Sequence, residues 1–147
     1  MNLVNKVYGD LPGAIHCLER SLARAREGGF ALLMAVSGIF LGRSLALAGR
    51  ADARSTLEQA IDHSESIGFM AFHPAGLAWL ADAYLREGRR ADAMAAIDRA
   101  LDLARTHGQH AQKAEALVAH GAIAGAGDTP DLEQAQTSIR QALVSCL

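Results

Sequence analysis

Histidine and cysteine side chains are common metal ligands and catalytic groups, and the chain holds six histidines and two cysteines. A zinc site needs three or four converging ligands. His107 and His110 form the one closely spaced histidine pair, but they flank Gly108 at an expected helix end. Glu115 is the one nearby carboxylate. The pattern therefore favours solvated turn histidines over a metal site.

Nucleophilic and phosphate chemistry would need other patterns. The sequence has no Gly-x-Ser-x-Gly elbow and no glycine loop typical of phosphate binding. Cys17 and Cys146 lie inside expected helices, and we predict that both are free thiols. Asp92, Asp98 and Asp102 recur along one expected helix and should face solvent. We expect no enzyme activity, no cofactor and no metal.

Composition narrows the class of protein. Half of the 147 residues are apolar and only 5% are aromatic, which favours close-packed helices. The net charge of −2 is spread along the chain without a basic stripe, so we do not expect direct nucleic-acid binding. Segment 30–48 is strongly apolar and carries Arg43 as its only charge, which raises the possibility of a membrane span. The segment instead falls in register with the repeated helices around it, which favours a buried helix. The first residues do not resemble a signal peptide, so we expect a cytoplasmic location.

The elements that position these residues are repeated helical hairpins. In the segment Leu77–Leu103, two apolar stripes at helical spacing flank Gly88. Small residues in both stripes, such as Ala81 and Ala100, would let two antiparallel helices approach closely. The turn glycines recur at 39–40 residues: Gly9, Gly49, Gly88 and Gly127 within hairpins, and Gly29, Gly68 and Gly108 between them. We call the two helices of each hairpin its first and second helix. The second helices share a small-large-small triplet of residues: Ala14, Leu18, Ser21; Ala53, Leu57, Ala60; Ala93, Ile97, Ala100; Ala135, Ile139, Ala142.

Helix-start signals agree with this division. Asp10 followed by Pro12 predicts the start of one second helix, and Thr129-Pro130-Asp131 predicts the start of the last, with Thr129 as the cap and Pro130 as the first helical residue. Residues 1–8 would be the end of a first helix. We expect either a chain that starts within a repeat or a piece of a longer protein.

These features together resemble the tetratricopeptide repeat (TPR) family. Leu77, Leu80, Ala81 and Tyr84 match the first-helix pattern of the family, and the triplets match its second helix. The period of 39–40 residues exceeds the usual 34 and is similar to repeats in bacterial signalling ATPases, transcriptional activators and nucleotide cyclases. The resemblance implies an all-α fold: a right-handed α-α superhelix of about three and a half stacked hairpins in a single domain, 1–147. The repeats would be 1–29 (partial), 30–68, 69–108 and 109–147.

The resemblance also implies a function. First helices would line a concave face that binds a protein or peptide, without enzyme activity. The groove residues expected in this face are Phe40, Arg43, Leu47, Trp79, Asp82 and Arg86. In the last repeat the equivalent side of the first helix would carry Glu115, Ala119 and Ala122. Trp79 and Phe40 could anchor a ligand or merely pack between adjacent first helices. The alternative function is a regulatory or effector-sensing segment of a larger ATPase- or cyclase-type regulator.

We also expect a homodimer. The partial first repeat would leave Val36, Ile39 and Phe40 partly exposed, and two such ends could cover each other. The C-terminal end, with Leu143, Val144 and Leu147, is a second candidate surface for self-association.

Overall fold

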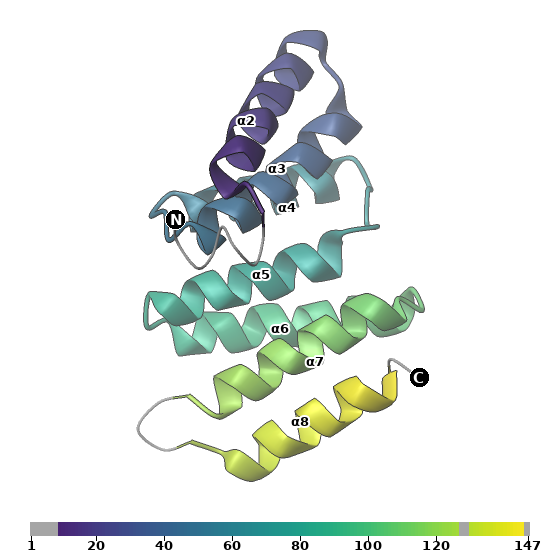
Figure 1. Cartoon of the computed structure of the whole chain (residues 1–147). Helices are drawn as coiled ribbons and strands as arrows, with labels where there is room; N and C mark the ends of the chain where they lie inside the picture. Colours follow the sequence, from purple (N-terminus) through teal and green to yellow (C-terminus); the bar gives the residue numbers. More distant parts are fainter. Residues whose placement is uncertain (1–8, 127–129, 146–147) are drawn as a thin grey trace. The chain divides into compact units, whose positions relative to one another are not determined.

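The computed structural model describes residues 9–126 and 130–145. In these ranges it contains seven α-helices and no β-strand: α2 (Leu11–Gly28), α3 (Ala31–Leu47), α4 (Ala53–Ser66), α5 (His73–Arg86), α6 (Arg90–Thr106), α7 (His110–Ala124) and α8 (Leu132–Ser145) (Figure 1). The chain divides into two compact units, Met1–Phe72 and His73–Leu147. We call them unit 1 and unit 2. The all-α expectation is confirmed.

The helices pair as hairpins in the predicted order. The most extensive packing joins α3 to α4 in unit 1, and α5 to α6 and α7 to α8 in unit 2. In addition, α2 packs on α3, and α7 packs on both α5 and α6. Each hairpin therefore combines one first helix (α3, α5 or α7) with the second helix that follows it.

Glycines end the helices because the turns need a left-handed backbone. Gly9, Gly29, Gly49, Gly68, Gly88 and Gly108 all have positive φ, between 64° and 78°. After Gly29 the chain forms two closing hydrogen bonds: Phe30 N–H donates to the Ala25 carbonyl, and Gly29 N–H donates to the Arg26 carbonyl. The same pair of bonds recurs at Gly49, Gly68, Gly88 and Gly108. The predicted turns are confirmed at the last five of these glycines, and Gly9 has the expected positive φ. Residues 1–8, predicted to be the end of a first helix, and Gly127 lie outside the described residues.

The start of α2 agrees with the sequence prediction, whereas the start of α8 differs from it. Asp10 Oδ1 accepts a hydrogen bond of 3.0 Å from Gly13 N–H, and Pro12 lies in the first turn of α2. At α8 the cap is Asp131, whose Oδ1 accepts from Gln134 N–H at 2.9 Å. The prediction that Pro130 opens this helix is wrong, because α8 begins two residues later. Thr129 lies outside the described residues.

Small residues bring the paired helices into close contact. Gly42 in α3, Ala81 in α5 and Gly121 in α7 are 39 and 40 residues apart, and all three are buried. A Cβ atom built at Gly42 would lie 2.5 Å from Leu57 Cγ, and one at Gly121 would lie 3.1 Å from the Ala135 carbonyl. A side chain at Gly42 would therefore push the facing helix away, and one at Gly121 would press on it.

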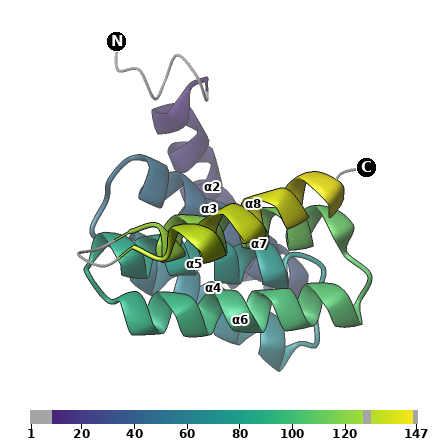
Figure 2. The same cartoon turned by 90° about the horizontal axis from the view of Figure 1, so that it is seen from below.

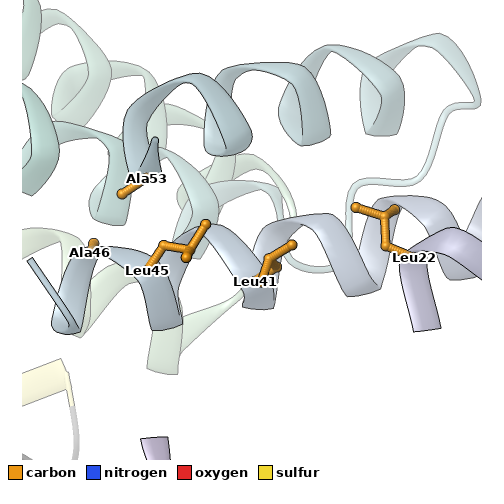
Figure 3. Packing of buried hydrophobic residues seen from close by; sticks show 5 residues of the cluster. All are labelled: Leu22, Leu41, Leu45, Ala46 and Ala53. Carbon is orange, nitrogen blue, oxygen red and sulfur yellow. The ribbon is translucent and has the colours of Figure 1, made fainter. Parts of the chain in front are cut away.

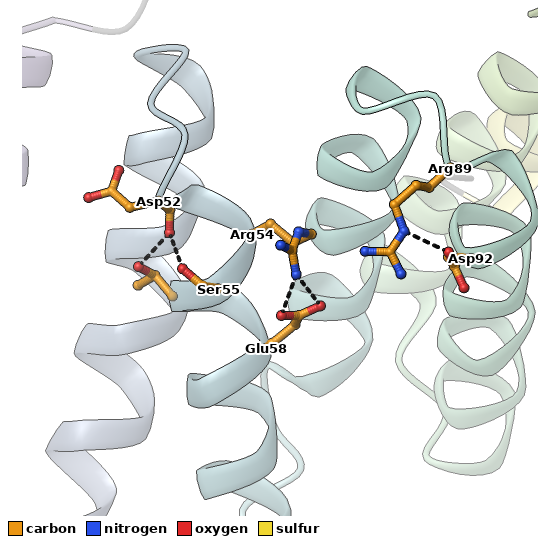
Figure 4. Close-up of polar contacts among 7 residues, drawn as sticks. Asp52, Arg54, Ser55, Glu58, Arg89 and Asp92 are labelled. Atoms are coloured by element: carbon orange, nitrogen blue, oxygen red, sulfur yellow. Dashed lines mark hydrogen bonds and ion pairs between the residues drawn. The ribbon is translucent and has the colours of Figure 1, made fainter.

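The buried faces of α4 and α6 follow the predicted triplets, whereas in α2 Ala14 is exposed and Leu18 and Ser21 are half-buried. Ala53, Leu57 and Ala60 are buried in α4, and Ala93, Ile97 and Ala100 have no exposed surface in α6. In unit 1, Leu22 of α2 joins a cluster with residues of α3 and α4: Leu41, Leu45, Ala46 and Ala53 (Figure 3). The outer faces carry local polar contacts, such as the ion pairs Arg54–Glu58 and Arg89–Asp92 (Figure 4). The fold is thus stabilised by apolar seams between helices, since exposed ion pairs contribute little.

Candidate functional site

The clearest polar link between first helices joins Trp79 of α5 to Glu115 of α7. Trp79 Nε1–H donates a hydrogen bond of 2.6 Å to Glu115 Oε1. Leu77, Leu80 and Ala81 turn into the core of the hairpin, which leaves Trp79 partly exposed on another side of α5. Both residues occupy positions that the repeat pattern assigns to the concave side. The structure therefore brings together side chains of α5 and α7 that the repeat pattern places on the same expected face.

Polar and small residues surround this link. In α5, Arg86 Nε donates to Asp82 Oδ2 at 3.0 Å, one helical turn from Trp79. In α7, helical spacing places Val118, Ala119 and Ala122 on the same side as Glu115. We define the first-helix face of unit 2 by these residues: Trp79, Asp82, Arg86, Glu115, Val118, Ala119 and Ala122.

Val118 is the residue of this face that the sequence analysis missed. Its side chain is 54% exposed, although valine is usually a core residue. Its spacing of three from Glu115 was the available signal, because residues three apart lie on one helix side. The exposed valine and the nearby alanines give this side of α7 an apolar surface made of small side chains.

The other expected groove residues lie in unit 1. Phe40 makes an edge-to-face contact with Phe72, with ring centroids 5.3 Å apart, and Phe72 makes a second such contact with Phe69 at 6.1 Å. This aromatic cluster favours packing over ligand anchoring for Phe40. Arg43 and Leu47 are half-buried on the same helix, α3. The six groove candidates thus divide equally between the two units.

The predicted self-association row is wrong at Ile39. That side chain has no exposed surface, and Val36 and Phe40 are half-buried. The apolar residues most exposed near the start of α3 are instead Phe30, Leu32 and Leu33. The reason is that α3 is apolar on nearly all sides, so the pattern does not reveal which side faces the solvent.

Unit 1 also contains a cavity of about 200 Å³ where α2, α3 and α4 meet. Its lining is apolar at Leu22, Met34 and Leu41, with Arg26 and His63 adding polar atoms. Small-molecule sites are usually about 300–1,000 Å³. The cavity suits a single side chain better than a whole metabolite.

The residues first considered for chemistry make local contacts with the backbone or with nearby arginines. His107 Nδ1 contacts the Leu103 carbonyl of its own helix at 2.9 Å, Asp92 pairs with Arg89, and Asp102 pairs with Arg105. Among the described residues, no three His, Cys, Asp or Glu side chains are grouped so that they could hold a metal ion. Cys17 is an exposed free thiol, and Cys146 lies outside the described residues. In the same part of the chain, no helix is long and apolar enough to cross a bilayer.

Comparisons with known proteins do not indicate a function for the chain. No protein-family model matches the chain, and neither a curated protein nor a solved structure matches it. Function must therefore be argued from the faces and contacts described above.

Proposed function

We propose that the chain is a non-enzymatic protein-interaction module that binds a peptide or helix of another protein on the first-helix face of unit 2. The observation that carries this proposal is the hydrogen bond between Trp79 and Glu115. It holds a partly exposed indole at the seam between two consecutive first helices. Tryptophan in such a position is a frequent anchor in protein interfaces, because it offers a large apolar area at a small cost in conformational entropy.

The surroundings of the indole indicate the chemistry of the partner. Val118, Ala119 and Ala122 offer apolar surface without large projections, so the backbone of a helix could approach closely. Asp82, Arg86 and Glu115 add charged groups around this apolar centre. An apolar centre with a polar rim is the usual anatomy of an interface. We therefore infer an amphipathic helical partner whose apolar side chains contact Trp79 and Val118.

The assignment of the hairpins to TPR-like repeats is part of the same proposal. Three observations support it: the recurring glycine turns, the buried triplets of α4 and α6, and the small residue shared by the three first helices. Each observation follows the same period of 39–40 residues.

A displayed library of amphipathic helical peptides tests the binding face. Peptides selected on the whole chain would be titrated against it, with Trp79 fluorescence as the signal, since the sequence contains one tryptophan. We expect Val118→Glu to weaken the selected peptides by at least about tenfold, as for loss of an interface hot spot. Helicity should be retained, because Val118 is 54% exposed.

Ala95→Glu is the matched control. Ala95 is an exposed residue of the second helix α6, so the same charge is added away from the proposed face. We expect this variant to bind like the parent. Selected peptides that bind Val118→Glu as tightly as the parent would contradict the proposed face.

A further inference from the structure

Helix α8 carries an exposed apolar stripe. Leu132, Ile139 and Leu143 are 63%, 46% and 67% exposed. Their spacing of seven and four residues places them on one side of the helix. A different side, with Ala135, Ser138 and Ala142, is buried. The extensive packing of α8 is on α7, and α8 lies at the edge of unit 2 (Figures 1 and 2). The stripe is therefore largely exposed to solvent.

The internal repeat shows that equivalent residues are normally covered. Matching the small-large-small triplets aligns Ile139 and Leu143 with Ile97 and Leu101 of α6. Ile97 has no exposed surface and Leu101 has 7%. The difference arises because α6 packs extensively on both α5 and α7, whereas the extensive packing of α8 is on α7. The stripe of α8 is thus a surface of the kind that this chain buries under another helix.

Charges along α8 indicate what covers it. The helix starts with two acidic residues, Asp131 and Glu133. Its other end borders a hollow of about 460 Å³ lined by three basic side chains, Arg105, Lys113 and Arg140, together with Gln141 and Val144. In α8 and its cap, Asp131 and Glu133 lie at the start and Arg140 lies in the second half. A second α8 that runs antiparallel would place acid against base at both ends, whereas a parallel one would oppose like charges.

We propose that a second copy of this chain covers the stripe, with the two α8 helices packed antiparallel about a two-fold axis. Leu132 of one copy lies opposite Leu143 of the other, and Glu133 lies beside Arg140 of the other copy. Each contact occurs twice, because a two-fold interface uses the same patch on both copies. This surface is distinct from the first-helix face of unit 2, so the dimer leaves that face free for a partner.

Molar mass in solution tests the dimer. Multi-angle light scattering of the whole chain should give twice the 15.5 kDa chain mass at micromolar concentration. Leu132→Gln combined with Leu143→Gln should weaken the dimer at least about tenfold while helicity is retained, since both side chains are more than half exposed. Val118→Gln is the matched control, an exposed apolar residue off the stripe, and should leave the mass unchanged.

A charge swap tests the antiparallel arrangement. Glu133→Arg and Arg140→Glu should each weaken the dimer, and the two together should restore it, because the reciprocal pairs are rebuilt with reversed sign. Gln134→Arg, an exposed residue on the side of α8 opposite the stripe, should have no effect.

Three results would overturn the proposal. One is a parent chain that remains a monomer at micromolar concentration, whether or not it binds inorganic phosphate in the basic hollow. Another is a dimer that the glutamine pair leaves intact. The third is a double charge variant that associates no better than the single ones.

Discussion

Replacing Gly42 with alanine should destabilise the chain, although alanine is the better helix former. The new Cβ would lie 2.5 Å from Leu57 Cγ and 3.1 Å from Leu57 N. Non-bonded carbon atoms prefer separations of about 3.5–4.0 Å. Leu57 has no exposed surface, so its side chain cannot turn out into the solvent. The methyl group must therefore push α3 and α4 apart.

Two opposing effects set the change in the free energy of unfolding for Gly42→Ala. Alanine in place of glycine within a helix gains about 1 kcal/mol, and overpacking a core costs about 1–3 kcal/mol. At Gly42 the overlap involves backbone as well as side chain, so the upper part of that range applies. We expect a net loss of about 1–2 kcal/mol in the free energy of unfolding, measured by urea denaturation with far-UV circular dichroism. Gly125→Ala is the control, because its Cβ would meet atoms at ordinary distances of 3.4 Å or more and should change stability by less than about 1 kcal/mol.

A double-mutant cycle separates this contact from general effects on the helix. Leu57→Ala alone should cost about 2–5 kcal/mol by leaving a cavity. In the Gly42→Ala background the added methyl group enters that cavity, so the second substitution should cost at least about 1 kcal/mol less. Additive changes, or a Gly42→Ala variant as stable as the parent, would refute the proposed packing of α3 on α4.

Three further substitutions probe the repeat by thermal or urea unfolding. Gly88→Ala should cost about 1 kcal/mol, because its φ of 75° is strained for a residue with a Cβ; an unchanged melting temperature would contradict this turn geometry. Ala81→Leu should cost about 1–3 kcal/mol by overpacking the seam between α5 and α6, and an unchanged melt would argue against the repeat register. Asp10→Ala should cost about 1 kcal/mol by removing the acceptor of Gly13 N–H, whereas Asp10→Ser should retain most of the stability.

The sequence predicted best those features that depend on local chemistry. Turn glycines can be predicted from the sequence because few other residues adopt positive φ. All six predicted turn glycines among the described residues have positive φ. The burial of the triplet around Ile97 could be predicted, because a small-large-small pattern indicates which side of a helix can approach a neighbouring helix. The equivalent triplet around Ile139 has the same pattern, yet Ile139 is 46% exposed. A pattern thus identifies an apolar side but not whether another helix covers it.

The candidate site was less predictable, because it depends on contacts between distant segments. Phe40 packs against Phe72, which lies outside the helices, and no local spacing indicates that contact. For Trp79 and Glu115 the repeat frame placed both residues on the same expected face, but it did not indicate the hydrogen bond that joins them. In α3, where nearly every side is apolar, periodicity carried no information about Ile39.

The most direct test of the repeat frame and its binding face is the indole N–H resonance of Trp79. A chain with one tryptophan gives one such signal, and the hydrogen bond to Glu115 forms only if α5 and α7 lie side by side with these faces adjacent. We predict that Glu115→Ala shifts this resonance strongly in an otherwise preserved NMR spectrum, whereas Asp98→Ala on α6 leaves it in place. An indole resonance that is unchanged in Glu115→Ala would contradict the packing of consecutive first helices and, with it, the proposed binding face.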